Sequence, residues 1–460
     1  MTRMCGRARV TASGALLLAS VSACLNANPS FDEDATSDAT ATSGTTTPST
    51  SATTSAGPTA GTEPSTDSST DPSTDPTTDP TTDPSTSAST SGVGTTTTSS
   101  GATDTSATLA TGETDTSSTT AAGPAFPDDW LYRQKIQFNT LTNAVDLLDF
   151  PVLIPLAAPD FDFSHARPDG ADLRFVDDDE VTVLAHETEV WIEGQDPLAR
   201  IWVRVPTLDQ LSDQDHIWLY YGSPDATPGD DPGAVWTADY WGVWHLSTLD
   251  DSTSLEHHAL DNQGATMGPG RVGDGHDFDG AASIDLPTPN APGIVDTSDG
   301  HASIWFRADV PPNDIAHVFY LSDVVTGDGH GAENELHGNL KVSGQFQGFA
   351  CCNASNAQGP VAGEGGWHHA LLSWTLGDSK PLKVFFDGAP VSTNENQMTL
   401  FDFTALIRLG RPGAAERFFT GTVDEFRLST AARDETWAKT EFITVDDPAS
   451  FLSFGAEEPL

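Results

Sequence analysis

A long segment near the N-terminus has too little apolar surface to fold, and it confines any folded core to the residues that follow it. From Asn26 to about Pro124 the sequence consists mostly of Thr, Ser, Ala, Asp, Gly and Pro, and neither Lys nor Arg occurs between Asn26 and Arg133. Such a segment cannot offset the backbone entropy lost on ordering, about 1–2 kcal/mol per residue. We therefore expect residues 24–125 to form a disordered tether.

The tether contains an imperfect four-residue repeat, Asp-Pro-Ser/Thr-Thr, between Ser65 and Pro84. Regularly spaced prolines favour extended, polyproline-like conformations, and the acidic residues repel one another. A flexible chain of this length would span roughly 50–60 Å on average, and a stiffer one more. Two interpretations stay open, a stalk glycosylated on its hydroxyl groups and an unmodified solvated spacer. In both, the segment acts through its length.

The N-terminus has the pattern of an export signal. Arginines at positions 3, 7 and 9 precede a mostly small and apolar run from Val10 to Val21. This run is shorter than the roughly 20 apolar residues that span a membrane. Small residues at positions 21–23 would let a peptidase reach the backbone, so we expect residues 1–23 to be a signal peptide.

The end of this signal, Val-Ser-Ala-Cys at positions 21–24, resembles a bacterial lipobox. The resemblance implies cleavage between Ala23 and Cys24 and attachment of lipid to Cys24, through which the protein would contact the membrane. Each buried methylene contributes about 0.8 kcal/mol, so two or three acyl chains would hold the protein stably. Leu25 after the cysteine indicates the outer membrane or cell surface by the enteric sorting rule. The alternative is an ordinary signal peptide that is cut elsewhere.

The chain is strongly acidic, with a formal net charge of −47. This charge argues against nucleic acid and anionic membrane surfaces as partners. It permits a hard cation such as calcium, although acidity more often reflects solubility or salty surroundings than a bound metal.

Cysteines are too few for a disulfide framework. After Cys24 only the adjacent Cys351 and Cys352 remain. Neighbouring cysteines rarely bond to each other, because the resulting eight-membered ring strains the peptide bond. A reduced pair and such a ring both stay open.

From Pro127 to Leu460 the local pattern is strand and turn. Residues 132–138 and 199–205 alternate between polar and apolar, and residues 216–221 form an aromatic and β-branched run. Short runs of this kind, bounded by Gly, Pro and Asp, predict strands. The fold class that follows is all-β, with antiparallel β-sandwich modules after the tether.

A series of motifs marks the first module, residues 126–230. Its members are Trp130–Arg133, Asp149–Ile154, Asp169–Phe175, Glu187–Trp191, Ile201–Pro206 and Leu219–Gly222. Their order and spacing resemble the family numbered 2341 among the domains of unknown function, which occurs in bacterial surface and secreted proteins. The resemblance implies a β-sandwich and carries no established chemistry.

A second series marks residues 236–430. Its members are Trp244–Leu246, Gly275–Gly280, His301–Arg307, Gly366–Ala370, Leu382–Gly388, Ile407–Gly410 and Phe419–Leu428. Together they resemble the laminin-G-like, concanavalin A-like jelly rolls of bacterial extracellular proteins. In the tail that follows, residues 431–460, we expect a short helix from Ala431 to Phe442 and a closing strand from Ala449 to Gly455.

A polar, glycine-rich stretch in the second module is the candidate ligand or calcium rim. Its side chains with oxygen or imidazole ligands are Asp328, His330, Glu333, Glu335 and His337. Carboxylate oxygens are the ligands that calcium prefers, which makes calcium the one metal or cofactor that we keep open. An ordinary solvated loop is the simpler interpretation.

Two adjacent pairs have a structural interpretation. Asp424 and Glu425 are consecutive, and neighbouring strand residues point to opposite faces, so we expect that they do not share a substrate cleft. By the same argument one of His368 and His369 would be a packed core histidine. We assign no catalytic residue, because the Glu-x-Asp-x-x-Glu strand of the retaining glucanases on this fold does not occur in the sequence.

These observations favour a lipid-anchored extracellular binding or adhesion protein that recognises a glycan or a protein through the concanavalin A-like domain. A glycan-active hydrolase is one alternative, and it would need two carboxylates roughly 5–9.5 Å apart that face one groove. A structural envelope component without a soluble ligand is the other. We rank these three functions by the resemblance to concanavalin A-like domains, although one fold can support many functions.

Overall fold

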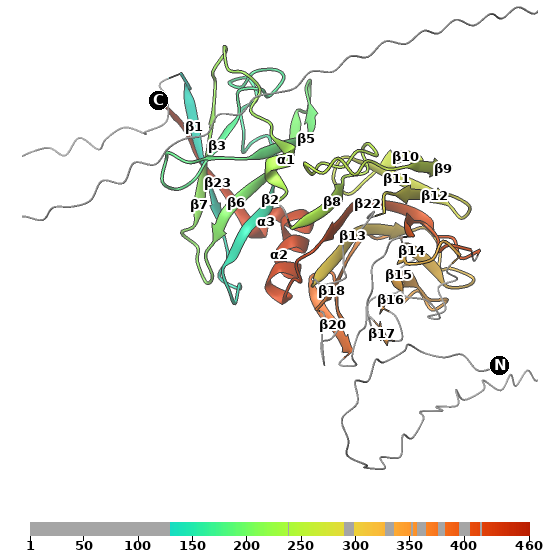
Figure 1. Cartoon of the computed structure of the whole chain (residues 1–460). Helices are drawn as coiled ribbons and strands as arrows, with labels where there is room; N and C mark the ends of the chain where they lie inside the picture. The colour runs from blue at the N-terminus through green and yellow to red at the C-terminus, as the bar shows by residue number, and fades with distance from the viewer. Residues whose placement is uncertain are drawn as a thin grey trace, which may run out of the picture. The chain divides into compact units, whose positions relative to one another are not determined.

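The computed structural model describes residues 129–237, 239–288, 299–326, 335–350, 353–356, 365–375, 382–394, 405–414 and 416–460. All of them belong to one compact unit, residues 110–460. The expected signal peptide, Cys24, the tether and the Cys351–Cys352 pair lie outside the described residues. Strands dominate the described part (Figure 1), which confirms the all-β prediction. None of its helices is long and apolar enough to cross a membrane.

The first module is a sandwich of two antiparallel sheets. Its strands are β1 (Tyr132–Phe138), β2 (Leu147–Ala157), β3 (Arg174–Val176), β4 (Val183–Leu184), β5 (His186–Ile192), β6 (Leu198–Leu208), β7 (His216–Tyr221) and β23 (Leu452–Pro459). One sheet has the order β23-β1-β7-β3-β4, and the other has the order β2-β6-β5. Apolar residues from both sheets pack in one buried core.

Alternation along β1 explains its place in this sandwich. Ile136 and Phe138 are buried in the core. On the opposite face, the guanidinium of Arg133 lies 3.9 Å from the ring centroid of Trp218 on β7, and the ammonium of Lys135 lies 5.0 Å from it. Cation–π contacts of this kind cover the aromatic ring while the charges stay near water.

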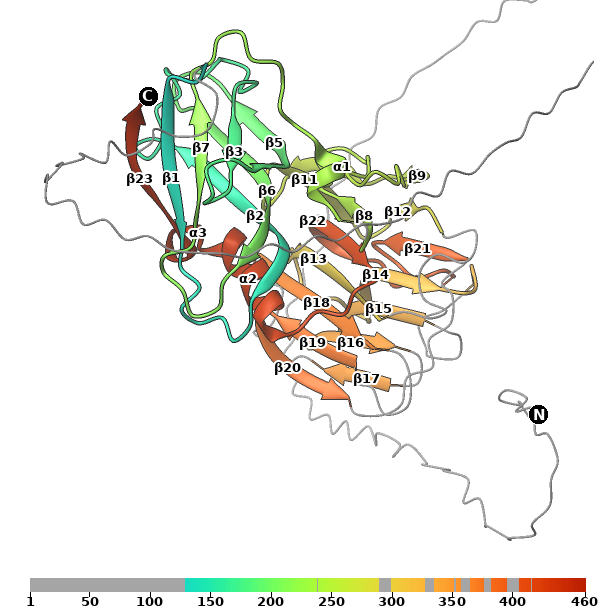
Figure 2. The same cartoon turned by 60° about the vertical axis from the view of Figure 1, so that its left-hand side comes forward.

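The last strand of the chain completes the sheet of the first module. β23 pairs with β1 in antiparallel register, with Phe138 opposite Leu452 and Tyr132 opposite Pro459. Figure 2 shows β23 beside β1, with β7 on the other side of β1. The first module is therefore built from two segments that are separated by the whole second module.

Helices lead into this closing strand. The short helix expected from Ala431 to Phe442 is present as α2 (Glu435–Asp446), four residues further along the chain. The strand expected from Ala449 starts only at Leu452, because α3 (Pro448–Phe451) precedes β23. Asp434 caps α2 by accepting a hydrogen bond from the backbone N–H of Trp437. Trp437 packs edge-on against Phe150 of β2 with ring centroids 4.6 Å apart, so the helix adds to the core of the first module.

The second module is a jelly roll that follows the short helix α1 (Pro232–Val235). Its strands are β8 (Tyr240–Trp244), β9 (Asp261–Gln263), β10 (Thr266–Pro269), β11 (Asp274–Asp279), β12 (Ser283–Leu286), β13 (Gly300–Ala308), β14 (Ala316–Ser322), β15 (Glu335–Leu340), β16 (Phe346–Ala350), β17 (Asn353–Asn356), β18 (His368–Trp374), β19 (Leu382–Phe386), β20 (Ala389–Asn394), β21 (Leu406–Leu409) and β22 (Thr420–Ser429). One sheet has the order β10-β11-β22-β13-β18-β19-β20, with β8 also paired to β22. The facing sheet has the order β17-β16-β15-β14-β21-β12-β9.

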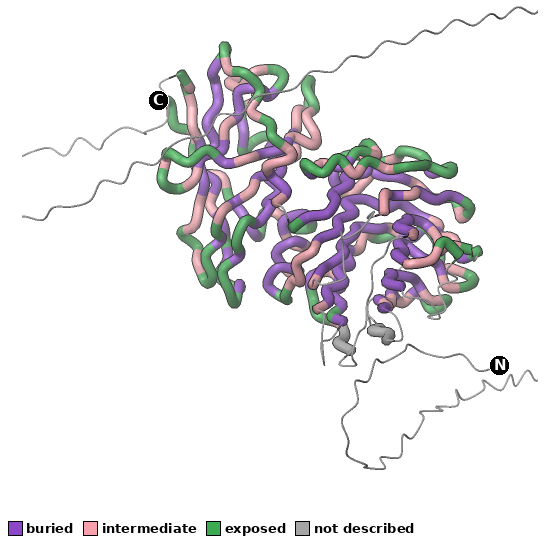
Figure 3. Tube along the Cα trace, viewed as in Figure 1, coloured by how far each residue is buried: buried purple, intermediate pink, exposed green. Residues whose placement is uncertain are grey.

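A second apolar core fills the space between these two sheets. Inward-facing residues of β13, β18 and β22 meet those of β12, β14, β15 and β21 there. Figure 3 shows the strands of this module mostly buried, while the connections near β9 and β10 are exposed. The opposite face of the first of these sheets is also covered, since Trp305, Leu371 and Phe385 join the core of the first module. The loops at the rim are therefore the parts of this module most available for function.

Candidate functional site

The expected rim residues divide between described and undescribed parts of the chain. Asp328, His330 and Glu333 lie outside the described residues. Glu335 and His337 do not lie in a loop, which corrects the expectation for these two positions: both belong to strand β15 and are buried. The reason is local alternation, since Leu336 between them packs in the core.

Both side chains are engaged by protein groups. The Glu335 carboxylate accepts a hydrogen bond from the Tyr320 hydroxyl at 2.7 Å, and its other oxygen lies 3.6 Å from Nε2 of His337. Burial lowers the pKa of His337 below its ordinary value, which favours the neutral imidazole. In the described residues, therefore, these two predicted ligands stabilise the outer face of a sheet.

This outer face carries a row of polar and aromatic side chains that sequence reasoning missed. Strand register sets Asp285 opposite Arg408, Arg408 opposite Tyr320, and Tyr320 opposite His337. The guanidinium of Arg408 pairs with the Asp285 carboxylate, and the His337 ring stacks on Phe349 with centroids 4.8 Å apart. In β12 and β21 the signal was present as a charged residue, Asp285 or Arg408, between two apolar ones, but only the register brings the strands together.

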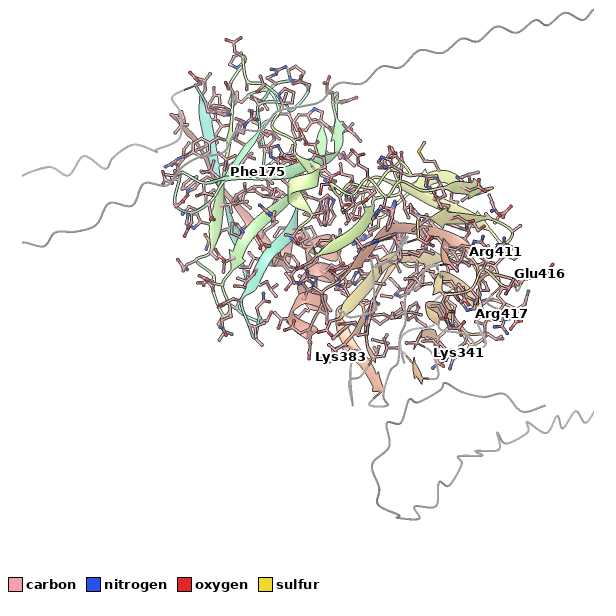
Figure 4. All side chains as sticks on the ribbon, viewed as in Figure 1. Phe175, Lys341, Lys383, Arg411, Glu416 and Arg417 are labelled. Carbon is pink, nitrogen blue, oxygen red and sulfur yellow. The ribbon has the colours of Figure 1, made fainter. Side chains whose placement is uncertain are left out.

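An open cavity of about 230 Å³ lies at the rim of the second module. The loop between β13 and β14 and the residues that lead into β22 line it, and they include Pro311, Asp314, Glu416 and Arg417. Asp314 and Glu416 are exposed, while the Arg417 side chain is largely buried with its Nε 4.0 Å from the Asp314 carboxylate. Figure 4 shows Glu416 and Arg417 at the edge of this module. The lining thus combines apolar side chains with charged groups in similar measure.

The expected separation of Asp424 and Glu425 does not hold, because β22 contains a bulge. Glu425 has a φ of 52°, and the pairing of β22 with β13 shifts register there. Val423 and Phe426 on either side both face the core, so the two acidic residues share the outer face of the sheet. Asp424 accepts hydrogen bonds from the backbone N–H groups of Arg271 and Val272.

Around this bulge lies a buried network of charges, which we name the junction cluster. Its members are Glu187, Glu189, His245, Glu425, Arg427 and Glu441, which come from both modules and from α2. Nδ1 of His245 lies 2.6 Å from Glu425, and its Nε2 lies 3.2 Å from Glu187. Arg427 donates to Glu425 at 2.6 Å and lies 3.5 Å from Glu441.

Indole groups complete the junction cluster. Trp236 donates to the Glu187 carboxylate and Trp202 to the Glu189 carboxylate, each at 2.7 Å. The guanidinium of Arg427 lies over both rings, 4.3 Å from the Trp202 centroid and 4.9 Å from the Trp236 centroid. Buried charges are tolerated when they are paired and hydrogen-bonded in this way.

The geometry of His245 favours an ion-pair network over a metal site. Ligand atoms of Glu189, His245 and Glu425 lie within 4.8 Å of one another, which is close enough to consider a cation. Metal ligation requires a neutral imidazole with a free lone pair, yet both ring nitrogens of His245 already face carboxylates. Burial would lower the pKa of His245, but Glu425, Glu187 and Glu189 together raise it well above 6.5. The residues present therefore fit an imidazolium that bridges two glutamates.

The junction cluster should make the protein sensitive to acid. Burial would raise the pKa of Glu425, but His245 and Arg427 hold it at about 2, below the ordinary 4.5. A carboxyl whose folded pKa is depressed stabilises the fold above its unfolded pKa, and this contribution is lost as the pH falls through the folded pKa. We expect the melting temperature to fall between about pH 4.5 and 2, and to fall less steeply in Glu425→Gln. Exposed Glu416→Gln is the control, and equal slopes in all three proteins would contradict the assignment.

The two adjacent histidines divide as expected. His369 is buried, with its Nε2 3.6 Å from Glu441, which confirms a packed core histidine. His368 is half-buried, and its Nδ1 lies 2.9 Å from the carboxylate of Asp387 in the following hairpin turn. Both histidines support the structure of the β18–β19 region.

The geometry defines a protein of two β-sandwich modules, the second a jelly roll. Residues 169–256 match the family described as a domain of unknown function, DUF2341, and residues 278–438 match the concanavalin A-like lectin/glucanases superfamily. Both matches agree with the resemblances seen in the sequence. No curated protein matches the chain.

Several solved structures match part of the chain at low similarity. The binding domain of Paraclostridial mosquitocidal protein 1 has 14% identity and a TM-score of 0.37, over 44% of this chain and 52% of that one. Domain 4 of the extracellular arabinanase AbnA from Geobacillus stearothermophilus, in complex with arabinotriose, has 17% identity and a TM-score of 0.34, over 44% and 97%. The CBM40 of a Ruminococcus gnavus IT-sialidase, bound to α2,3-sialyllactose, has 12% identity and a TM-score of 0.28, over 40% and 99%. This chain thus spans about half the length of the first of these structures.

Proposed function

We propose that this protein is a lipid-anchored extracellular binding protein that recognises a glycan or a protein through its concanavalin A-like module. The observation that carries the proposal is the match of residues 278–438 to the lectin/glucanase superfamily, together with an open rim cavity on that module. The cavity combines the exposed carboxylates of Asp314 and Glu416 with apolar walls. Such a surface suits hydroxyl-rich or peptide ligands, whose polar groups need partners and whose carbon skeletons need apolar contact.

The acidic pair of β22 does not fit glycoside hydrolysis. The most conspicuous acidic pair, Asp424 and Glu425, is buried. Asp424 is held by backbone N–H groups, while Glu425 is held by His245 and Arg427. A glycosidase needs its acid and its nucleophile or base to reach the substrate from one groove. Neither member of this pair can reach solvent without opening the junction.

The proposal is tested by presenting the chain, made soluble by Cys24→Ser, to an array of bacterial and plant glycans. We expect saturable binding to a defined subset of glycans, since a preformed cavity selects its ligand by shape and by a few polar groups. Running the array with calcium and with a chelator shows whether a cation takes part. If no glycan binds under either condition, the ligand is expected to be a protein. If neither a glycan nor a protein ligand binds, a structural role in the envelope is favoured.

The anchor makes a separate prediction. Cys24→Ser removes the thiol that would carry the diacylglycerol group, so we expect the protein to leave the membrane fraction and to lose incorporation of labelled fatty acid. Substitution of the neighbouring Leu25 by Ala serves as the matched control and should keep both properties. An unchanged membrane fraction with unchanged lipid labelling in Cys24→Ser would show that the protein is held in another way.

A further inference from the structure

A second open cavity, of about 470 Å³, lies on the first module, in the part of the chain without established chemistry. It forms between the segment that follows β2, residues 158–168, and the turn between β5 and β6, residues 193–197. Its volume falls within the range of about 300–1,000 Å³ that is typical of small-ligand sites. None of its lining residues belongs to the junction cluster or to the rim cavity.

Trp191 at the end of β5 forms an aromatic wall of this cavity, and contacts on several sides hold its ring in one orientation. One side of its ring packs on Gly170, where a Cβ would lie 2.9 Å from the ring carbons and where φ is 67°. Only glycine combines that backbone conformation with so close an approach. The indole N–H donates to the Pro168 carbonyl, and Phe163 meets the ring edge-on with centroids 5.3 Å apart. The half-buried indole is therefore held in place before any ligand arrives.

Polar groups stand beside this aromatic wall. Asp162 is more than half exposed, and it accepts hydrogen bonds from the hydroxyl and the backbone N–H of Ser164. Glu193 is exposed on the opposite side, in the β5–β6 turn. Arg167 also lines the cavity, but its guanidinium is occupied by Asp169 at 2.8 and 3.0 Å and by the Ala226 carbonyl. The acceptors that face a ligand are the exposed carboxylate of Glu193 and the carboxylate of Asp162, which also lies 3.9 Å from Nδ1 of His165.

This combination selects a class of ligand. A flat, rigid indole suits the apolar C–H face of a sugar ring, and carboxylates placed at its edge accept hydrogen bonds from sugar hydroxyls. The two carboxylates, on a chain of net charge −47, disfavour phosphates, sulfates and acidic sugars. A purely apolar ligand would leave the carboxylates desolvated without partners, at a cost in binding free energy.

We propose that this cavity, with Trp191 as its platform and Asp162 and Glu193 as its acceptors, binds a neutral sugar residue. It is a site on the first module, separate from the rim cavity of the second. The inference therefore does not depend on the proposed function of the second module. A protein with a recognition site on each module could hold two residues of one glycan or two different chains, which strengthens attachment without any new contact.

The test titrates the full chain carrying Cys24→Ser with neutral disaccharides, namely maltose, cellobiose and lactose, by calorimetry. We expect saturable binding of at least one of them, weakened about tenfold or more by Trp191→Ala and less by Trp191→Phe, which keeps a ring. Glu193→Gln should weaken binding as well, because an amide accepts fewer hydrogen bonds than a carboxylate. Trp367→Ala, which removes a half-buried indole that packs against the same apolar core as Trp191, is the matched control and should leave this binding unchanged.

Two further measurements keep the outcome decisive. Thermal melts of each variant separate a lost site from a lost fold, and Asp314→Ala at the rim cavity separates this site from the proposed one. Binding that survives Trp191→Ala, or the absence of binding to every neutral disaccharide, would overturn the proposal.

Choline is titrated in parallel, because aromatic rings beside carboxylates also suit a quaternary ammonium. Binding of choline in place of the sugars, sensitive to Trp191→Ala, would overturn the assignment to a sugar.

Discussion

Replacing Arg427 with Met is expected to lower the free energy of unfolding by about 3–5 kcal/mol, the cost of breaking a buried ion pair by removing one partner. The guanidinium of Arg427 is buried between the carboxylates of Glu425 and Glu441. Without it, these two acids remain in a site of low dielectric with too little positive charge. Chemical denaturation followed by tryptophan fluorescence measures the loss directly.

The control for this variant is Lys383→Met, which removes an exposed cation from another strand of the same sheet. An exposed substitution of this kind usually changes stability by no more than about 0.5 kcal/mol. The double variant Arg427→Met with Glu425→Gln should recover part of the loss, since it removes one of the stranded charges. A loss in Arg427→Met as small as that in the control would show that the junction cluster does not hold the modules together.

Ending the chain after Thr430 is expected to unfold the first module, although every residue from β1 to β7 remains. The truncation removes β23, which pairs along β1, and it takes Trp437, Phe451 and Leu452 out of the core. Removing one large buried apolar side chain costs about 2–5 kcal/mol. Three of them together approach or exceed the whole stability of a typical domain, about 5–15 kcal/mol.

Hydrogen exchange measures this effect strand by strand. We expect the amides of β1 and β7 to lose protection in the truncated chain, while removal of residues 24–125 leaves them protected, because the tether has almost nothing to bury. Protected amides in β1 and β7 after the truncation would show that the first module folds without the closing strand.

The local sequence pattern was enough to predict individual strands but not which strands pair to complete each sheet. The alternation in residues 132–138 and 199–205 predicts β1 and β6, because each has one face in the core. The sequence of residues 452–459 cannot say that this strand pairs with β1, since the two strands are more than 300 residues apart. Long-range register is a property of the tertiary structure.

The candidate sites show the same limit. The prediction that Asp424 and Glu425 point apart assumed regular alternation, and the bulge at Glu425 turned both toward the outer face. Trp191 and Gly170 stood in recognised motifs, but their contact depends on a turn and a strand that meet only in the fold. Bulges and ring-on-glycine contacts leave no periodic signal in a sequence, and they shaped both the junction cluster and the cavity on the first module.

The most direct test of the proposed function compares binding to a glycan array by the chain carrying Cys24→Ser with and without the substitutions Asp314→Ala and Glu416→Ala. These two residues are exposed at the rim cavity, so their removal should leave the fold intact. We predict that glycan binding through the second module is lost or weakened about tenfold or more in the rim variant. It should persist in a control with Asp178→Ala and Asp213→Ala, two exposed acids on the first module. Equal binding by the rim variant and the control would contradict recognition at the rim of the concanavalin A-like module.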